Sequence, residues 1–137
     1  MKSFGVKKVH VIRVDRGEEV VSSVIKACAE AGIGGAVLSG LGLLSKTKLA
    51  VFNPEKEEYE TFDVNTPMEL ASLAGNVSLR EGKPFAHIHV VLGNKERTVA
   101  GHLVEGYVGG TCEIAIIELE GELKRDLERG GLFLLNV

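Results

Sequence analysis

Apolar and polar residues alternate along most of this chain, and a period of two is typical of β-strands that bury one face. Turn-forming residues such as Gly, Asn and Pro separate the alternating segments. The segments that predict strands are residues 6–14, 36–44, 47–52, 58–64, 68–79, 85–92, 98–105 and 112–119, with residues 132–135 as a candidate last strand. Residues 68–79 also fit a helix, although Ser72, Gly75 and Asn76 favour a strand with a bulge or kink. Short strands joined by hairpin-like turns predict a mainly antiparallel sheet of about seven strands. Two of the expected turns are at residues 45–46 and 109–110.

One stretch changes to a helical period after the first strand. Asp15, followed by Glu18 three residues later, resembles a capping box that starts a helix, and Gly32 is expected to end it in the αL conformation. A second, short and charged helix is predicted over residues 122–129, closed by glycines. The apolar positions that share one side of the first helix are Val20, Val21, Val24, Cys28 and Ala31.

The composition is that of an ordinary globular domain. The chain has 137 residues, of which 45% are hydrophobic and 26% charged, and this apolar content excludes a disordered chain. We expect a single α+β domain over residues 1–137, with one main helix flanking the sheet. No apolar run reaches the length of a membrane span, and the start has no signal-peptide pattern. The expected location is the cytoplasm, where Cys28 and Cys112 would be free and buried.

The net charge argues against one class of function. An autonomous nucleic-acid-binding protein usually carries a strong basic excess, whereas this chain has a formal net charge of −3. The net charge does not exclude a local patch of basic residues on the surface.

Three of the four histidines are close together in the sequence. His87 and His89 are two residues apart on a predicted strand, so their side chains leave the same face. His102 lies on the next strand, and two hairpin registers are open. A loop centred on residues 94–95 places His102 opposite His87, whereas a loop centred on residues 95–96 places it opposite His89. Either register brings the three imidazoles together on one face.

Three histidines without a fourth protein ligand are typical of an open metal site. Zinc is the expected ion, although imidazole also suits nickel, copper and iron. The alternative is that these side chains are ordinary polar residues of a sheet face, or a pH-sensitive contact. An open metal site also suggests an enzyme that hydrolyses its substrate with a metal-bound hydroxide.

Other residues are weaker candidates. Glu69 and Glu113 are candidate helpers of a metal site, as second-shell or ligand-facing groups, although neither spacing identifies a general base. Gly101 precedes His102 and allows a neighbouring backbone to approach closely. His10 has no such neighbours and is expected to be a plain strand residue. The charged segment 118–129 is expected to be a solvated surface.

A set of segments resembles the plants-and-prokaryotes-conserved (PPC) domain, and the match in order and spacing covers almost the whole chain. The segments are residues 38–44 (LSGLGLL) with Leu49, residues 69–79 (ELASLAGNVSL), His87 to Val90 (HIHV) and Gly101 to Leu103 (GHL). The resemblance implies a compact α+β fold that assembles as a homotrimer. It also implies that His87, His89 and His102 match the histidines that accompany a bound metal in prokaryotic members.

The resemblance has two departures that bear on function. In plants the domain accompanies an AT-hook that binds the minor groove of DNA, and this chain has no Arg-Gly-Arg-Pro segment. The plant segment tied to partner interaction is here residues 66–71 (TPMELA), so that recognition does not transfer.

Three functional readings remain. The first, which the resemblance implies, is a stand-alone PPC-type binding module with a DNA-associated or regulatory role and a three-histidine metal site. The alternative is a metal-dependent enzyme or small-ligand-binding protein that uses the open coordination position of that site. A purely structural oligomer is a third reading.

Overall fold

Two long, bent strands organise the fold. In the computed structural model, which describes residues 1–137, they are β2 (Ala36–Asn53) and β6 (Thr98–Leu119). The sequence predicts two strands in place of each, with turns at residues 45–46 and 109–110, and this prediction is wrong. The pairing of β2 with β6 shifts register between Gly42 and Leu44 and again before Lys46. Such bulges bend a strand without ending it, so the small and polar residues mark bends rather than turns.

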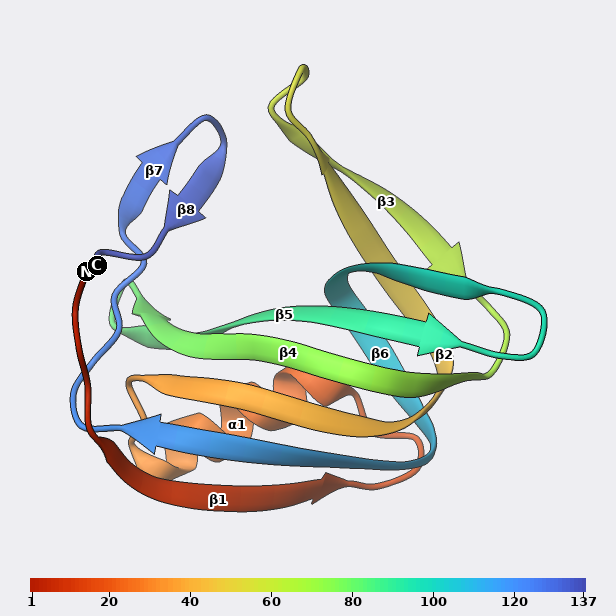
Figure 1. Cartoon of the computed structure of the whole chain (residues 1–137), viewed down its shortest axis with the longest axis horizontal. Coiled ribbons are helices and arrows are strands. Elements are labelled where there is room, and N and C mark those ends of the chain that lie inside the picture. The colour runs from red at the N-terminus through yellow and green to blue at the C-terminus, as the bar shows by residue number, and fades with distance from the viewer.

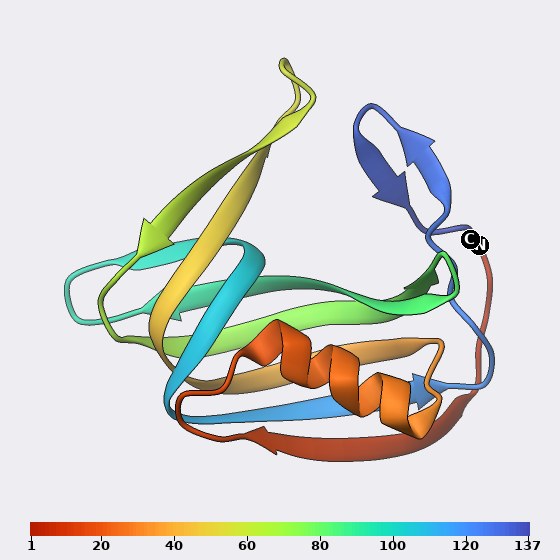
Figure 2. The same ribbon diagram turned by 180° about the vertical axis from the view of Figure 1, so that it is seen from behind.

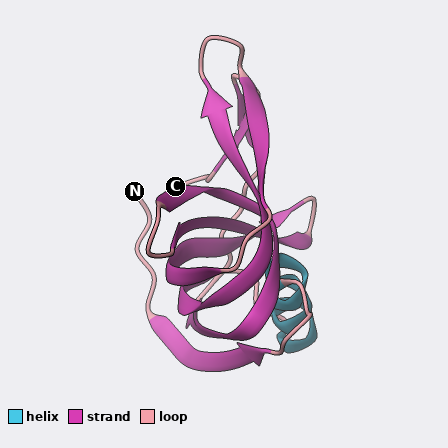
Figure 3. Cartoon of the chain, turned by 90° about the vertical axis from the view of Figure 1, so that its right-hand side faces the viewer, coloured by secondary structure: helices cyan, strands magenta, loops and turns pink.

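Six strands form one sheet that closes on itself. The order is β1-β6-β5-β4-β2-β3, and β6 also pairs with β2, so β6, β5, β4 and β2 form a ring. Every pair is antiparallel, which confirms the predicted α+β class with a mainly antiparallel sheet. Figure 3 shows the curl of this sheet. The remaining strands of the sheet are β1 (Val6–Val14), β3 (Glu58–Val64), β4 (Met68–Arg80) and β5 (Lys83–Gly93).

A single helix, α1 (Val20–Ala31), covers one face of the sheet, as Figures 1 and 2 show from opposite sides. The helix begins later than the sequence predicts. Its N-cap is Glu19, whose carboxylate accepts hydrogen bonds from two backbone N–H groups of the first turn, while Asp15 lies in the preceding loop. The helix ends at Gly32 with φ of +67°, as predicted. Of the positions predicted to share its buried side, Val20, Val24 and Cys28 are buried and Val21 is partly buried. Ala31 is exposed, because it lies in the last turn of the helix.

The core fills the space between α1 and the sheet and continues inside the ring. Its largest fully buried members include Leu38, Leu49, Met68, Ile88 and Ile114. Both cysteines, Cys28 and Cys112, are free and buried, as predicted. With 12 residues, α1 falls short of the length and apolar character that a membrane-spanning helix needs.

The C-terminal segment differs from its prediction. Residues 122–129 form no helix. They continue as an extended chain held by two backbone hydrogen bonds to Leu79, at the end of β4, and then enter β7 (Leu127–Arg129). β7 pairs with β8 (Leu132–Leu134) through a turn of two glycines with positive φ. This small hairpin and the β2–β3 hairpin project to the same side of the molecule (Figures 1 and 2).

Candidate metal centre

Strand β5 positions two of the three histidines through simple alternation. Its residues with even numbers, Ala86, Ile88, Val90 and Leu92, are buried in the core. His87 and His89 therefore point to the opposite face, where His87 is partly buried and His89 is exposed. The apolar positions thus determine the direction of the histidines.

The third histidine arrives through the pairing of β5 with β6. His102 lies directly opposite His89, which is the register centred on residues 95–96. The connecting turn covers four residues, and the Asn94 side-chain oxygen accepts the backbone N–H groups of Glu96 and Arg97. This turn therefore sets the register that brings the imidazoles together.

The three imidazoles form a tight group. Their ring centroids are 5.0 Å apart for His87 and His89, 5.2 Å for His87 and His102, and 5.5 Å for His89 and His102. One ligand atom from each ring lies within 4.8 Å of the others. The Nε2 atoms of His87 and His89 are 3.2 Å apart. All three nitrogens can therefore face a single ion.

The surroundings keep two of these rings neutral. Burial, assisted by the positive charge of Arg125 and by the neighbouring imidazoles, lowers the pKa of His87 to about 4. Burial, with contributions from His89 and Arg125, also lowers the pKa of His102. A metal binds the neutral imidazole, so both rings are in the ligating form at neutral pH without first losing a proton.

An unsatisfied polar atom supports the fit of this group to a metal ion. The Nδ1 atom of His102 is buried and has no hydrogen-bond partner, which is uncommon in a folded protein. A set of three imidazole donors with no carboxylate or thiolate suits a divalent ion such as zinc, with one position left for a further ligand.

The histidines open into a pocket of about 420 Å³. It lies between the two projecting hairpins, and their tips approach closely at Glu57 and Gly131. The ring of Tyr59 lies 5.3 Å from that of His102, measured between centroids. No carboxylate lines the pocket. Besides the three histidines, the lining consists of Tyr59, Arg80, Phe85, Arg125 and residues 131–134.

A comparison with known protein families agrees with this architecture. The profile of the Plants and Prokaryotes Conserved (PCC, also written PPC) domain matches residues 1–120. The chain belongs to this family. No curated protein sequence matches it.

Solved structures of PPC proteins superimpose closely on this one. A PPC protein of Pyrococcus horikoshii is 39% identical, with a TM-score of 0.94 over 100% of this chain and 96% of the other. A metal-containing protein of Archaeoglobus fulgidus is 36% identical, with a TM-score of 0.93 over 98% and 99% of the two chains. A candidate DNA-binding protein of Bacteroides thetaiotaomicron is 24% identical, with a TM-score of 0.86 over 96% and 94%.

The other candidate residues of this PPC domain lie away from the histidines' pocket. Glu69 is exposed at the end of β4 that pairs with Gly93. Glu113 lines a separate depression on the open face of the sheet. Gly101 allows close approach of β2, because a Cβ there would lie 3.0 Å from the carbonyl oxygen of Ala50. His10 forms a hydrogen bond with Glu118, with 2.9 Å between its Nε2 atom and a carboxylate oxygen.

Sequence reasoning missed the arginines of the pocket. The segment 118–129 was expected to be a solvated surface, yet Glu118 and Arg125 are buried. Mixed charges without periodicity carry no local signal for burial. Only the parallel bridge of Lys124 to Leu79 brings Arg125 to the histidines' side of the sheet.

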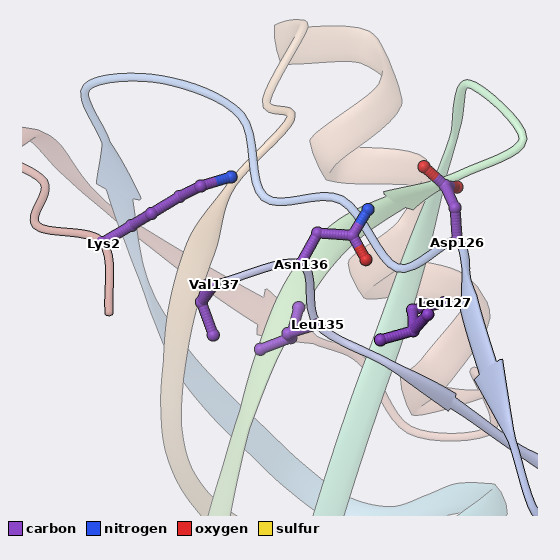
Figure 4. A pocket seen from close by; sticks show the side chains of 6 residues that line it. All are labelled: Lys2, Asp126, Leu127, Leu135, Asn136 and Val137. Carbon is purple, nitrogen blue, oxygen red and sulfur yellow. The ribbon is translucent and has the colours of Figure 1, made fainter.

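A second pocket of this PPC domain carries no comparable chemistry. It measures about 530 Å³ and is formed where the N-terminal segment meets the last residues of the chain (Figure 4). Its lining contains no histidine or cysteine and consists of Lys2, Asp126, Leu127, Leu135, Asn136 and Val137. The three histidines are therefore the stronger candidate for a functional site.

Proposed function

We propose that this protein is a stand-alone PPC binding module in which His87, His89 and His102 hold a divalent metal ion, zinc, and a small molecule binds at the open side of this centre. The observation that carries the proposal is the convergence of three histidines, within 4.8 Å of one another, in the wall of a 420 Å³ pocket. The description of the Archaeoglobus fulgidus relative as metal-containing supports it.

The pocket favours ligand binding over hydrolysis. A bound zinc ion supplies a Lewis acid that can polarise an oxygen of a ligand. Hydrolysis also needs a group that moves a proton, and the carboxylates predicted for that role, Glu69 and Glu113, do not line the pocket. The phenol of Tyr59 and the guanidinium groups of Arg80 and Arg125, which also line the pocket, are hydrogen-bond donors that would bind and orient a ligand. The alternative for the same pocket is that the protein is a metal-dependent enzyme.

The metal site is tested by elemental mass spectrometry of protein purified without chelator. We expect about one zinc ion per chain, because three neutral imidazoles make a complete open site. His87→Ala should lower the metal content at least about tenfold, since it removes one of three ligands. His10→Ala is the matched control, because His10 lies on β1 outside the pocket. Equal metal content in all three proteins would contradict the proposal.

DNA binding is a second candidate function, favoured by the description of the Bacteroides thetaiotaomicron relative. The net charge of −3 and the missing AT-hook oppose high affinity. The test is the binding of a labelled DNA duplex at several salt concentrations. Binding that weakens steeply with added salt would support this function, whereas no binding at low salt would remove it.

The resemblance to the family also suggests a homotrimer, and an apolar surface on the open face of the sheet supports it. Cross-strand pairing places Val9 and Val37 on either side of Ile117, and Val11 beside Ala115. Val9, Val11 and Val37 are 57%, 75% and 44% exposed. An apolar surface of this kind fits contact with further copies of the chain.

The two cysteines support a reducing compartment such as the cytoplasm, because both are free.

A further inference from the structure

The pocket contains a buried cation that lacks an anionic partner. Arg125 is only 6% exposed. Its guanidinium group donates hydrogen bonds to the Asn76 side-chain oxygen at 3.0 Å, the Phe133 carbonyl at 2.8 Å and the Ser78 hydroxyl at 3.3 Å. All three acceptors are neutral. Burying a charge is costly unless an opposite charge accompanies it, so this arrangement is incomplete as it stands.

A second guanidinium group beside it is also unpaired. Arg80 stacks on the ring of Phe133 at 3.5 Å, and both arginines lie within 6 Å of the Phe85 ring centre. The ion pairs of the protein involve other cations, namely Lys7, His10, Arg13, Lys56 and Lys124. Two positive charges therefore line a pocket that has no carboxylate of its own.

Arg125 also has donors to spare. A guanidinium group carries five N–H donors, and the three hydrogen bonds of Arg125 use three of them. The two that remain can bind an acceptor within the pocket. The neutral bonds hold the group in one orientation, which lowers the entropic cost of binding a ligand.

We propose that the pocket binds a small carboxylate with a short apolar group, and that Arg125 pairs with its charge beside the three histidines. This inference rests on the proposed function for the role of the metal. A carboxylate can accept the free N–H groups of Arg125 and place its other oxygen toward the histidines. The apolar group would lie against Phe85 and the leucines of β8, Leu132 and Leu134, which share the lining.

The lining favours a carboxylate over a phosphate. A phosphate group presents more acceptor oxygens and usually needs several backbone N–H groups or a lysine in addition to an arginine. The pocket contains no lysine, and almost half of its lining is apolar. A carboxylate has fewer oxygens to satisfy, so the two arginines and a metal suffice for it.

The test uses calorimetric titration of the full chain, zinc-loaded and chelator-treated, with three probes: butyrate, butyramide and inorganic phosphate. Butyramide has nearly the shape of butyrate but no charge. We expect zinc-loaded protein to bind butyrate at least about tenfold more tightly than butyramide, because a charge-assisted pair replaces a neutral contact. We also expect butyrate to bind more tightly than phosphate.

Two variants assign the effect to Arg125. Arg125→Gln should weaken butyrate binding about 10- to 100-fold and leave butyramide binding nearly unchanged. Lys124→Gln is the matched control, because it removes the same charge from a neighbouring side chain outside the pocket. If Arg125→Gln does not fold, the comparison of butyrate with butyramide on the wild-type protein decides the question.

The outcomes separate the inference from the proposed function. Equal affinity for butyrate and butyramide, or tighter binding of phosphate than of butyrate, overturns the inference. If the same sample contains about one zinc ion per chain, the proposed metal site is still supported. If zinc does not bind, the proposed function fails. In that case, chelator-treated protein that still prefers butyrate to butyramide, and loses this preference in Arg125→Gln, would support the anion site without the metal.

Discussion

Burial and a neighbouring positive charge together decide the protonation state of His87 and His102, two of the three proposed metal ligands. His87 lies beside Arg125 and two other imidazoles, so adding a proton there costs desolvation and repulsion. The same two causes prepare the site for its ligands, because they favour neutral nitrogens for a metal and leave a positive guanidinium group for an anion. A single arginine thus influences both halves of the proposed site.

This environment predicts a pH dependence for the metal-free protein. The pKa of His87 falls from 6.5 to about 4 on folding. Between these values the unfolded chain binds more protons at this position than the folded chain does. The free energy of unfolding therefore decreases as the pH falls from about 6.5 to about 4, and the contribution of His87 levels off below that.

The measurement is the Tm of chelator-treated protein between pH 7.5 and pH 4, for the wild type and for His87→Gln. Other groups titrate in both proteins, so the difference between the two curves isolates His87. We expect the Tm of the variant to fall less steeply through this range. Parallel curves would show that His87 is not held neutral by folding.

The close approach of β4 and β5 supports the position of His87. A Cβ on Gly75 would overlap the carbonyl oxygen of His87 on β5. This oxygen belongs to the backbone, so it cannot move away without moving the strand. Gly75 pairs directly with Ile88, whose side chain is fully buried. The absence of a side chain at residue 75 therefore keeps the two strands at their normal spacing.

Gly75→Ala is expected to force β4 away from β5. Overpacking of this kind costs about 1–3 kcal/mol of unfolding free energy, and the metal content should fall because His87 moves. Denaturant unfolding and elemental analysis measure the two effects. Gly93→Ala is the matched control on β5, since its Cβ would meet nothing closer than 3.7 Å. The same stability for both variants would contradict the tight packing at residue 75.

The open face of the sheet is the surface to test for assembly of several copies of the chain. We expect the wild-type protein to sediment as a trimer. Val11→Glu should shift the population toward monomer, because a charge would be buried in an apolar interface. Val51→Glu is the control, since Val51 is also exposed, at 53%, but lies on the β2–β3 hairpin. A monomeric wild type, or an equal shift in both variants, would contradict the proposed trimer.

The local pattern of residues was enough to predict β1, β3, β4 and β5, the buried positions Val20, Val24 and Cys28 of α1, and the shared face of His87 and His89. These features depend on periodicity within a few residues, which is visible in the chain itself. The limits of β1 and β3 and the αL cap at Gly32 are correct for this reason. The face of His102 followed as well, because both open registers gave the same answer.

Tertiary structure alone decided the continuity of β2 and β6, the closure of the sheet and the burial of Arg125. Each depends on pairing between segments that are distant in the sequence, such as β2 with β6 and Lys124 with Leu79. A glycine pair or a serine predicts a turn locally, whereas pairing on both sides keeps the strand extended through a bulge. The charged segment 122–129 forms no helix because its backbone bonds to the end of β4 instead. The histidines were therefore visible in the sequence, but the arginine that completes their pocket was not.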